Sequence, residues 1–172
     1  MAHDNIEIKC RYKDLKQVRN ILKHKGAVLC GRGRQIDTYY KVPKGRLKIR
    51  KCKFENNLIY YEREDLTGPK HSRVMIVDLE KNPEIEEIIK KLFDVLIVVD
   101  KQRELYSISN LRFHIDKVKG LGNFVEIEVV DKTGDVGLRK LNSQCNHYMK
   151  LLKIDKSDLI DSGYSDLLLG KH

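Results

Sequence analysis

Two glutamates two positions apart, Glu126 and Glu128, have the spacing in this chain that most directly suggests chemistry. In an extended strand, residues two apart point to the same side, so both carboxylates share one face and Val125, Ile127 and Val129 share the other. Carboxylates that close repel each other unless a cation neutralises them. Mg²⁺ and Mn²⁺ prefer oxygen ligands and commonly bridge protein carboxylates to substrate phosphates. The pair therefore predicts a divalent metal site.

Basic residues occupy one face of several other predicted strands. In the segment 46–51, Lys48 and Arg50 alternate with Leu47 and Ile49. Lysine and arginine bind phosphate oxygens through charge-assisted hydrogen bonds, and arginine does so in bidentate fashion. Carboxylates and basic rows inside one closed sheet would suit a metal-bound polyphosphate. The basic set is Lys9, Lys48, Arg50, Arg63, Lys101 and Arg103, and the acidic set is Glu7, Asp116, Glu126 and Glu128.

A blander interpretation has to be weighed against this one. A single strand with one charged face is usually just half exposed, and a surface salt bridge contributes at most about 1 kcal/mol. Here five strands carry charges of matched kinds on one face. A barrel closed around such charges would need a ligand to offset the cost of burying them. We therefore favour a ligand site.

The charge balance limits the partner. Of 172 residues, 34 are Lys or Arg and 25 are Asp or Glu, which gives a net charge of +9 and predicts an anionic partner. Basic rows with interleaved tyrosines could follow a nucleic-acid backbone. The sequence has no recognisable nucleic-acid-binding motif, and the aligned carboxylates would repel phosphate without metal. We expect a small-molecule triphosphate instead of nucleic acid.

Composition and length favour one soluble domain, residues 1–172. The chain is 41% apolar and long enough to bury a core. It has no stretch near the roughly 20 apolar residues of a membrane span. Its first residues carry no apolar signal region, so we expect a cytoplasmic protein without membrane association. The four cysteines form no Cys-x-x-Cys pair, which argues against a zinc ribbon.

Periodicity places these residues on an ordered series of elements. Helical spacing covers 14–25, 83–93 and 138–152, and the tail 156–169 is helical or turn-like. The segment 27–34 is a short strand that leads into 35–40, and 74–79 is predicted as a buried strand. The remaining strands are 5–11, 46–51, 58–64, 98–107, 111–118 and 124–130, the last two joined by a glycine-containing hairpin loop.

Several motifs in this order resemble the CYTH superfamily of triphosphate tunnel enzymes, in particular the class IV adenylyl cyclase-like members. The run 116–128 contains Gly-Leu-Gly-Asn-Phe-Val-Glu-Ile-Glu, and 35–40 reads Gln-Ile-Asp-Thr-Tyr-Tyr. The segments 5–9, 46–50 and 101–103 are similar to the family's other charged strands, and 163–168 to its C-terminal Ser-Tyr-Ser-Asp-Leu-Leu. The resemblance spans nearly the whole chain.

The resemblance implies a fold of class α+β: an eight-stranded antiparallel β tunnel, a closed barrel with a charged interior and flanking helices. It implies Mg²⁺ or Mn²⁺ as cofactor, and since related tunnel proteins are often dimers it allows a homodimer. We expect Lys9 and Glu7 to take part in catalysis. The implied metal ligands are Glu7, Asp116, Glu126 and Glu128, and the implied phosphate-binding residues are Lys9, Lys48, Arg50, Arg63, Lys101 and Arg103.

Asn5 departs from the family pattern, because it stands where a first glutamate is usual and an amide is a weaker ligand for a hard cation. Conversion of ATP to cyclic AMP and pyrophosphate is our first expectation. A triphosphatase acting on inorganic triphosphate or an organic one such as thiamine triphosphate is the alternative, and a non-catalytic polyphosphate- or RNA-binding module is the second. His114 shares the face of Asp116, and we expect it to be structural.

Overall fold

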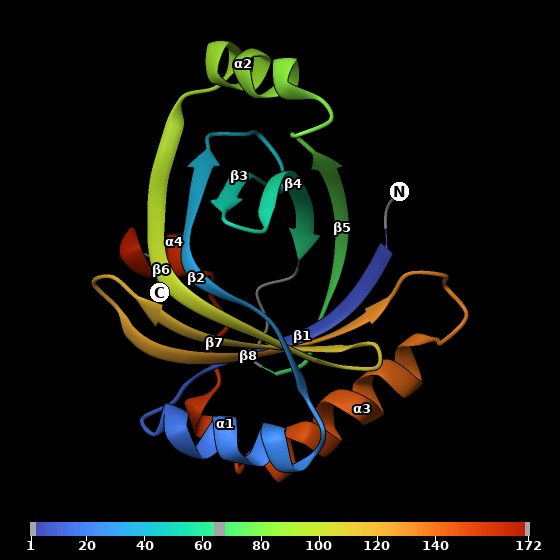
Figure 1. The fold of residues 1–172 in the computed structure, drawn as a ribbon. Helices are drawn as coiled ribbons and strands as arrows, with labels where there is room; N and C mark the ends of the chain where they lie inside the picture. Colours follow the sequence, from blue (N-terminus) through green and yellow to red (C-terminus); the bar gives the residue numbers. More distant parts are fainter. Residues whose placement is uncertain (1–2, 64–67, 171–172) are drawn as a thin grey trace.

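The computed structural model describes residues 3–63 and 68–170, whose strands close into an antiparallel barrel (Figure 1). The order around the barrel is β1-β5-β4-β3-β2-β6-β7-β8, and β8 pairs back to β1. The predicted α+β fold with an eight-stranded antiparallel tunnel is confirmed. The strands are β1 (His3–Arg11), β2 (Val28–Tyr40), β3 (Arg46–Cys52), β4 (Glu55–Arg63), β5 (Lys70–Asp78), β6 (Val95–Ile108), β7 (Leu111–Val118) and β8 (Gly122–Asp131).

Two strands differ from the sequence-based expectation. The segments 27–34 and 35–40 form one continuous strand, β2, because it pairs with β6 along almost its whole length. The predicted buried strand 74–79 begins earlier, at Lys70, and only alternate residues of its first half are buried. Val74 is buried while Met75 is exposed, as expected when one face of a strand lines a barrel and the other meets solvent.

The barrel places its apolar side chains outward on one side and covers them with helices. Ile6, Ile8 and Cys10 of β1 alternate with Glu7 and Lys9, and the apolar three belong to a buried cluster outside the tunnel. In Figure 1, α1 (Leu15–His24) and α3 (Leu138–Leu151) lie together beneath β1, β7 and β8. The charged face of these strands is therefore left to the interior.

Both covering helices follow from their sequences. Asp14 caps α1 by accepting hydrogen bonds from the backbone N–H groups of Lys16 and Gln17 at 3.0 and 3.1 Å. Along α3, the side chains of Leu141 and Cys145 are fully buried at helical spacing. A fully buried leucine contributes about 1.5–3 kcal/mol relative to an exposed one. The helices thus cover the apolar outer face on one side of the barrel.

The remaining helices lie elsewhere on the barrel. Figure 1 shows α2 (Pro83–Leu92) on the side away from α1 and α3, where Ile85 and Ile89 pack on a smaller apolar cluster. The tail forms a 3₁₀ turn (Lys156–Asp158) and α4 (Tyr164–Leu168). Over the described ranges, no helix combines the length and apolar character that crossing a bilayer requires.

Candidate active site

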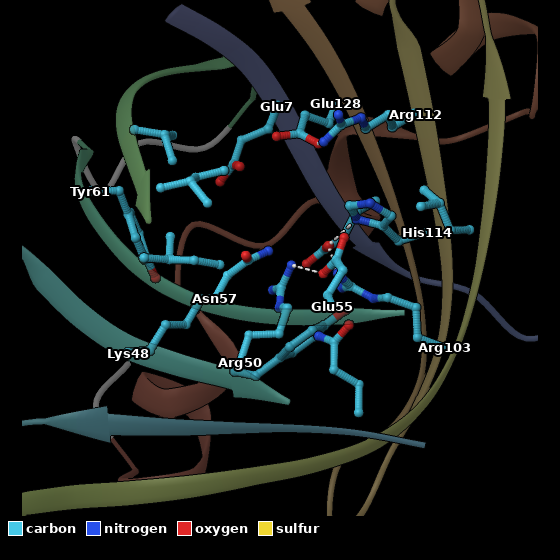
Figure 2. Close-up of a pocket in the computed structure, with 18 of the residues that line it drawn as sticks. Glu7, Lys48, Arg50, Glu55, Asn57, Tyr61, Arg103, Arg112, His114 and Glu128 are labelled. Atoms are coloured by element: carbon cyan, nitrogen blue, oxygen red, sulfur yellow. Dashed lines mark hydrogen bonds and ion pairs between the residues drawn. The ribbon is translucent and has the colours of Figure 1, made fainter. Parts of the chain in front are cut away.

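The interior of the barrel is a cavity lined by charged side chains from strands all around it (Figure 2). Five of the predicted phosphate-binding residues and three of the predicted metal ligands lie in this lining. Figure 2 shows Glu7, Glu128 and Arg112 grouped at one part of the wall, and Arg50, Glu55 and His114 at another. The predicted site residues in the lining are Lys9, Lys48, Arg50, Lys101, Arg103, Glu7, Glu126 and Glu128.

Strand register brings the three glutamates together; we call Glu7, Glu126 and Glu128 the carboxylate wall. Glu7 of β1 lies directly opposite Glu128 of β8, and Lys9 lies opposite Glu126. Opposed residues in an antiparallel pair share a face, so these side chains project into the cavity from two adjacent strands. The two-residue spacing of Glu126 and Glu128 was therefore a sound guide to a shared face.

Glu126 is the most heavily engaged member of the carboxylate wall. It pairs with Lys9 Nζ at 3.0 Å, Arg103 Nη2 at 2.8 Å and His114 Nδ1 at 2.8 Å. Burial alone would raise the pKa of Glu126, but Lys9, Arg103 and His114 hold that pKa well below its usual range. Glu126 therefore stays ionised. His114, expected to be structural, is hydrogen-bonded and also lines the cavity.

Glu128 is held by Asn5. The Asn5 amide nitrogen donates to Glu128 Oε1 at 2.5 Å, and Arg112 Nη1 lies 3.8 Å from Glu128 Oε2. Asn5 is buried, and its Oδ1 has no hydrogen-bond partner among the described residues. An unpartnered buried amide oxygen is costly unless something fills its lone pairs. Asn5 thus offers a carbonyl-type oxygen where the family pattern has a carboxylate.

These oxygens fit a hard divalent cation in their chemistry. Glu7, Glu126 and Glu128 supply carboxylate oxygens and Asn5 an amide oxygen, which are the donors that Mg²⁺ and Mn²⁺ prefer. Within the described part of the chain, no three His, Cys, Asp or Glu side chains already converge as a metal set. Glu126 and Glu128 are instead oriented toward basic side chains, Lys9 and Arg103 for Glu126 and Arg112 for Glu128.

A second charged group forms around Asp37 of β2; we call Asp37, Lys48, Arg50 and Lys101 the Asp37 cluster. Arg50 Nε lies 2.9 Å from Asp37 Oδ1, and Lys48 and Lys101 lie 3.2 and 3.4 Å from Oδ2. Burial would raise the pKa of Asp37, yet Arg50, Lys48 and Lys101 keep it well below its ordinary value. One fully buried carboxylate therefore fixes three cations at the cavity wall.

Lys101 is the most strongly perturbed of these cations. Its side chain is almost completely buried. Burial first, and then the positive charge of Arg103, lower the pKa of Lys101 to about 7. The carboxylates of Asp37 and Asp116 oppose this shift without overcoming it. Lys101 is therefore poised to gain or lose a proton near neutral pH.

Asp116, a predicted metal ligand, lies behind the cavity wall. Its carboxylate accepts hydrogen bonds from Arg103 Nε and Nη2 at 2.7 and 2.5 Å and from the Tyr164 hydroxyl at 2.9 Å. Asp116 is fully buried and is absent from the cavity lining. In this structure it orients Arg103 toward the cavity, so a metal contact at Asp116 would require these partners to move.

The C-terminal segment is tied to the barrel beside these groups. The ring of Tyr164 lies under Lys9 Nζ at 4.2 Å and Lys101 Nζ at 4.9 Å, distances typical of cation–π contacts. Lys70 Nζ donates to the backbone carbonyls of Ile160 and Asp161. Through Tyr164, the tail contributes directly to the cavity wall.

Some site residues could not be placed or were missed. Arg63 ends β4, but its side chain lies outside the described residues, so its phosphate-binding role stays a prediction. Asp37 was missed as a functional group, although its alternation with Gln35 and Tyr39, which line the cavity, places it on the inner face. Tyr164 had no such signal, because a turn-like tail carries no strand period.

A family model and a curated relative match this chain over most of its length. A family model described as the CYTH domain matches residues 3–159. A protein of Methanocaldococcus jannaschii named "putative adenylate cyclase" is 27% identical over 172 residues, covering 94% of this chain and 97% of that protein.

Solved structures agree in fold. A Pyrococcus horikoshii OT3 protein is 23% identical with a TM-score of 0.78, covering 95% of this chain and 98% of its own. A Hippeastrum protein named "putative adenylyl cyclase", with a reported dominant triphosphatase activity, is 15% identical with a TM-score of 0.60, covering 98% and 97%. At these identities the structures show a shared fold. Because the family model matches most of its length, this chain belongs to the CYTH domain family.

Proposed function

We propose that this protein binds a triphosphate in its tunnel and processes it with the help of Mg²⁺ or Mn²⁺. The observation that carries the proposal is the cavity lining, which combines six Lys and Arg side chains with the carboxylate wall inside a closed barrel. Buried charges of both signs are expensive unless they serve a ligand. A metal-bound polyphosphate would neutralise both, because the metal binds the carboxylates and the phosphates bind the basic side chains.

The basic residues divide into two groups with different roles. The three basic residues of the Asp37 cluster outnumber the two carboxylates paired with them, Asp37 and, at Arg50, Glu55. This side therefore keeps a net positive charge for phosphate oxygens. Lys9 and Arg103 are instead paired with Glu126. A divalent cation held by Glu7, Glu126, Glu128 and the Asn5 oxygen would polarise the phosphates and neutralise their charge. Lys9 and Arg103 would then be available to bind phosphate oxygens.

Our first candidate reaction is cyclisation of ATP to cyclic AMP and pyrophosphate. It requires loss of a proton from the ribose 3′-hydroxyl, attack on the α-phosphate and departure of pyrophosphate. Glu7 and Lys9, adjacent on the inner face of β1, would orient the reacting groups, and the Asp37 cluster would hold the leaving pyrophosphate. The name of the Methanocaldococcus jannaschii relative supports this candidate.

Hydrolysis of a triphosphate is the second candidate, since phosphoryl transfer relies mainly on positioning and charge neutralisation and both reactions can use one clamp. Asn5 favours it, because it removes one carboxylate from the pattern of the cyclase-like members. The reported triphosphatase activity of the Hippeastrum protein also supports it. Duplex nucleic acid is disfavoured, because the basic rows face the interior of a closed barrel.

Product identification separates the candidates. Purified protein is incubated with Mg²⁺ or Mn²⁺ and either ATP or inorganic triphosphate, and products are resolved by anion-exchange chromatography. Cyclic AMP with pyrophosphate would establish the cyclase, whereas orthophosphate from inorganic triphosphate without cyclic AMP would establish the hydrolase. If neither substrate is turned over while RNA is bound and Glu126→Gln leaves that binding intact, the binding module replaces both.

A further inference from the structure

An aromatic side chain that phosphate binding does not explain lines the same cavity. Phe54 lies in the turn between β3 and β4 and remains 39% exposed. Inorganic triphosphate presents only charged oxygens, which gain nothing from an apolar ring. In the lining of a charged cavity, this ring offers an aromatic face on which a ligand ring could stack.

The backbone of β2 is shaped to receive this ring. A Cβ added to Gly31 would lie 2.8 Å from the Phe54 ring, so the ring rests directly over the glycine backbone. Leu105 lies opposite Gly31 in the β2–β6 pair and also lines the cavity. We call Phe54 and Leu105, together with the Gly31 backbone between them, the apolar rim.

Asn57 adds a polar group on the inner face of β4. It lies opposite Arg50 in the β3–β4 pair, and Figure 2 shows its amide directed into the cavity. Its amide makes no side-chain hydrogen bond to the other described residues, so donor and acceptor are both available. Asparagine can pair with the edge of a heteroaromatic base by two hydrogen bonds.

From these features we propose that the apolar rim is a base-binding subsite, in which Phe54 stacks on the heteroaromatic ring of a nucleoside triphosphate and Asn57 hydrogen-bonds its edge. This rests on the proposed function, because it takes the triphosphate to be held by the basic residues of the same cavity. It narrows the substrate class from triphosphates in general to those carrying an aromatic base. Stacking of this kind tolerates different bases, since each presents a π-face.

The test compares ATP with inorganic tripolyphosphate, which carries no base. Binding of each is measured by titration calorimetry with Ca²⁺ in place of Mg²⁺, because its looser coordination should slow turnover. Phe54→Ala should weaken ATP binding roughly tenfold or more and leave tripolyphosphate binding within about twofold of wild type. Gly31→Ala should act in the same direction, because the added methyl group displaces the ring while Phe54 remains in the chain.

Matched controls separate stacking from general damage. Met75→Ala removes an exposed apolar side chain from β5 that is absent from the cavity lining, and should change neither affinity. Tripolyphosphate binding by each variant shows that its phosphate-binding residues are correctly folded. Equal losses of affinity for both ligands, or no loss for ATP, would overturn the base-binding subsite. Neither result would contradict the proposal that the tunnel binds triphosphate. If wild-type protein binds neither ligand, the proposed function itself fails.

Discussion

On the β2–β3–β6 side of the tunnel, one carboxylate, Asp37, holds three cations. On the β1–β8 side, two carboxylates, Glu126 and Glu128, are shared among Lys9, Arg103, Arg112, His114 and the Asn5 amide. The Asp37 cluster thus has an excess of positive charge. In the carboxylate wall, a metal ion could replace the basic partners of the carboxylates. Those basic side chains could then bind phosphate. Under the proposed function, the Asp37 cluster is a permanent phosphate-binding side and the carboxylate wall is an exchangeable metal-binding side.

The strongest way to break the Asp37 cluster is Asp37→Asn. It would leave three buried cations without their shared counter-ion, and removing one partner of a buried ion pair costs about 3–5 kcal/mol. We expect the free energy of unfolding, measured by urea denaturation, to fall by about this amount. Asp100→Asn is the control, because Asp100 pairs with the exposed Arg34. An equal loss in both variants would show that the cluster has no special role.

The carboxylate wall should instead be most sensitive in activity. Glu126→Gln removes a carboxylate oxygen donor and its charge, so we expect turnover of the accepted triphosphate to fall about a hundredfold or more, with a matching loss of Mn²⁺ binding measured by electron paramagnetic resonance. Glu104→Gln is the matched control, because Glu104 pairs with Arg19 and is absent from the cavity lining. Normal Mn²⁺ binding by Glu126→Gln would contradict the assignment.

The protonation of Lys101 should make stability and triphosphate binding depend on pH. Because its folded-state pKa is about 7 and below that of an ordinary lysine, the unfolded chain binds this proton more tightly. Lys101 therefore makes stability rise with pH from about 7 toward the ordinary lysine value. A bound triphosphate favours the protonated form, so binding above about pH 7 should take up a proton.

Calorimetry of triphosphate binding at pH 8 in buffers of different ionisation enthalpy measures that uptake. Lys101→Arg keeps the positive charge without titrating near neutrality and should abolish the uptake. Uptake that persists undiminished in Lys101→Arg would assign the proton to another group.

The smallest effect is expected where the two sides meet, at Tyr164. Tyr164→Phe keeps the ring beneath Lys9 and Lys101 but removes the hydroxyl that donates to Asp116. One hydrogen bond contributes about 0.5–1.5 kcal/mol, so we expect a few-fold weaker triphosphate binding and a small loss of stability. Tyr148→Phe, on α3 outside the barrel, is the control. A loss of unfolding free energy as large as that of Asp37→Asn would mean that the hydroxyl orders the charged residues on both sides of the tunnel.

Much of the fold and part of the site could be predicted because strand alternation is a local property. Simple counting puts Glu7 and Lys9 on the same side of β1, opposite the apolar Ile6 and Ile8, and the structure places both charged residues in the cavity lining. The same counting put Glu126 and Glu128 on one face. Boundaries shifted at β2 and β5, where pairing with neighbours extends the strands.

The sequence by itself determined which residue types alternate, and hence that charged faces existed to be enclosed. Only the tertiary structure decided which charges meet. Asp37 binds cations from β3 and β6, and Asp116 faces Arg103 instead of the cavity. Tyr164 reaches Asp116 and Lys101 from the tail. The physical reason is that ion pairs across a barrel depend on the register and closure of strands far apart in the chain, which no local period encodes.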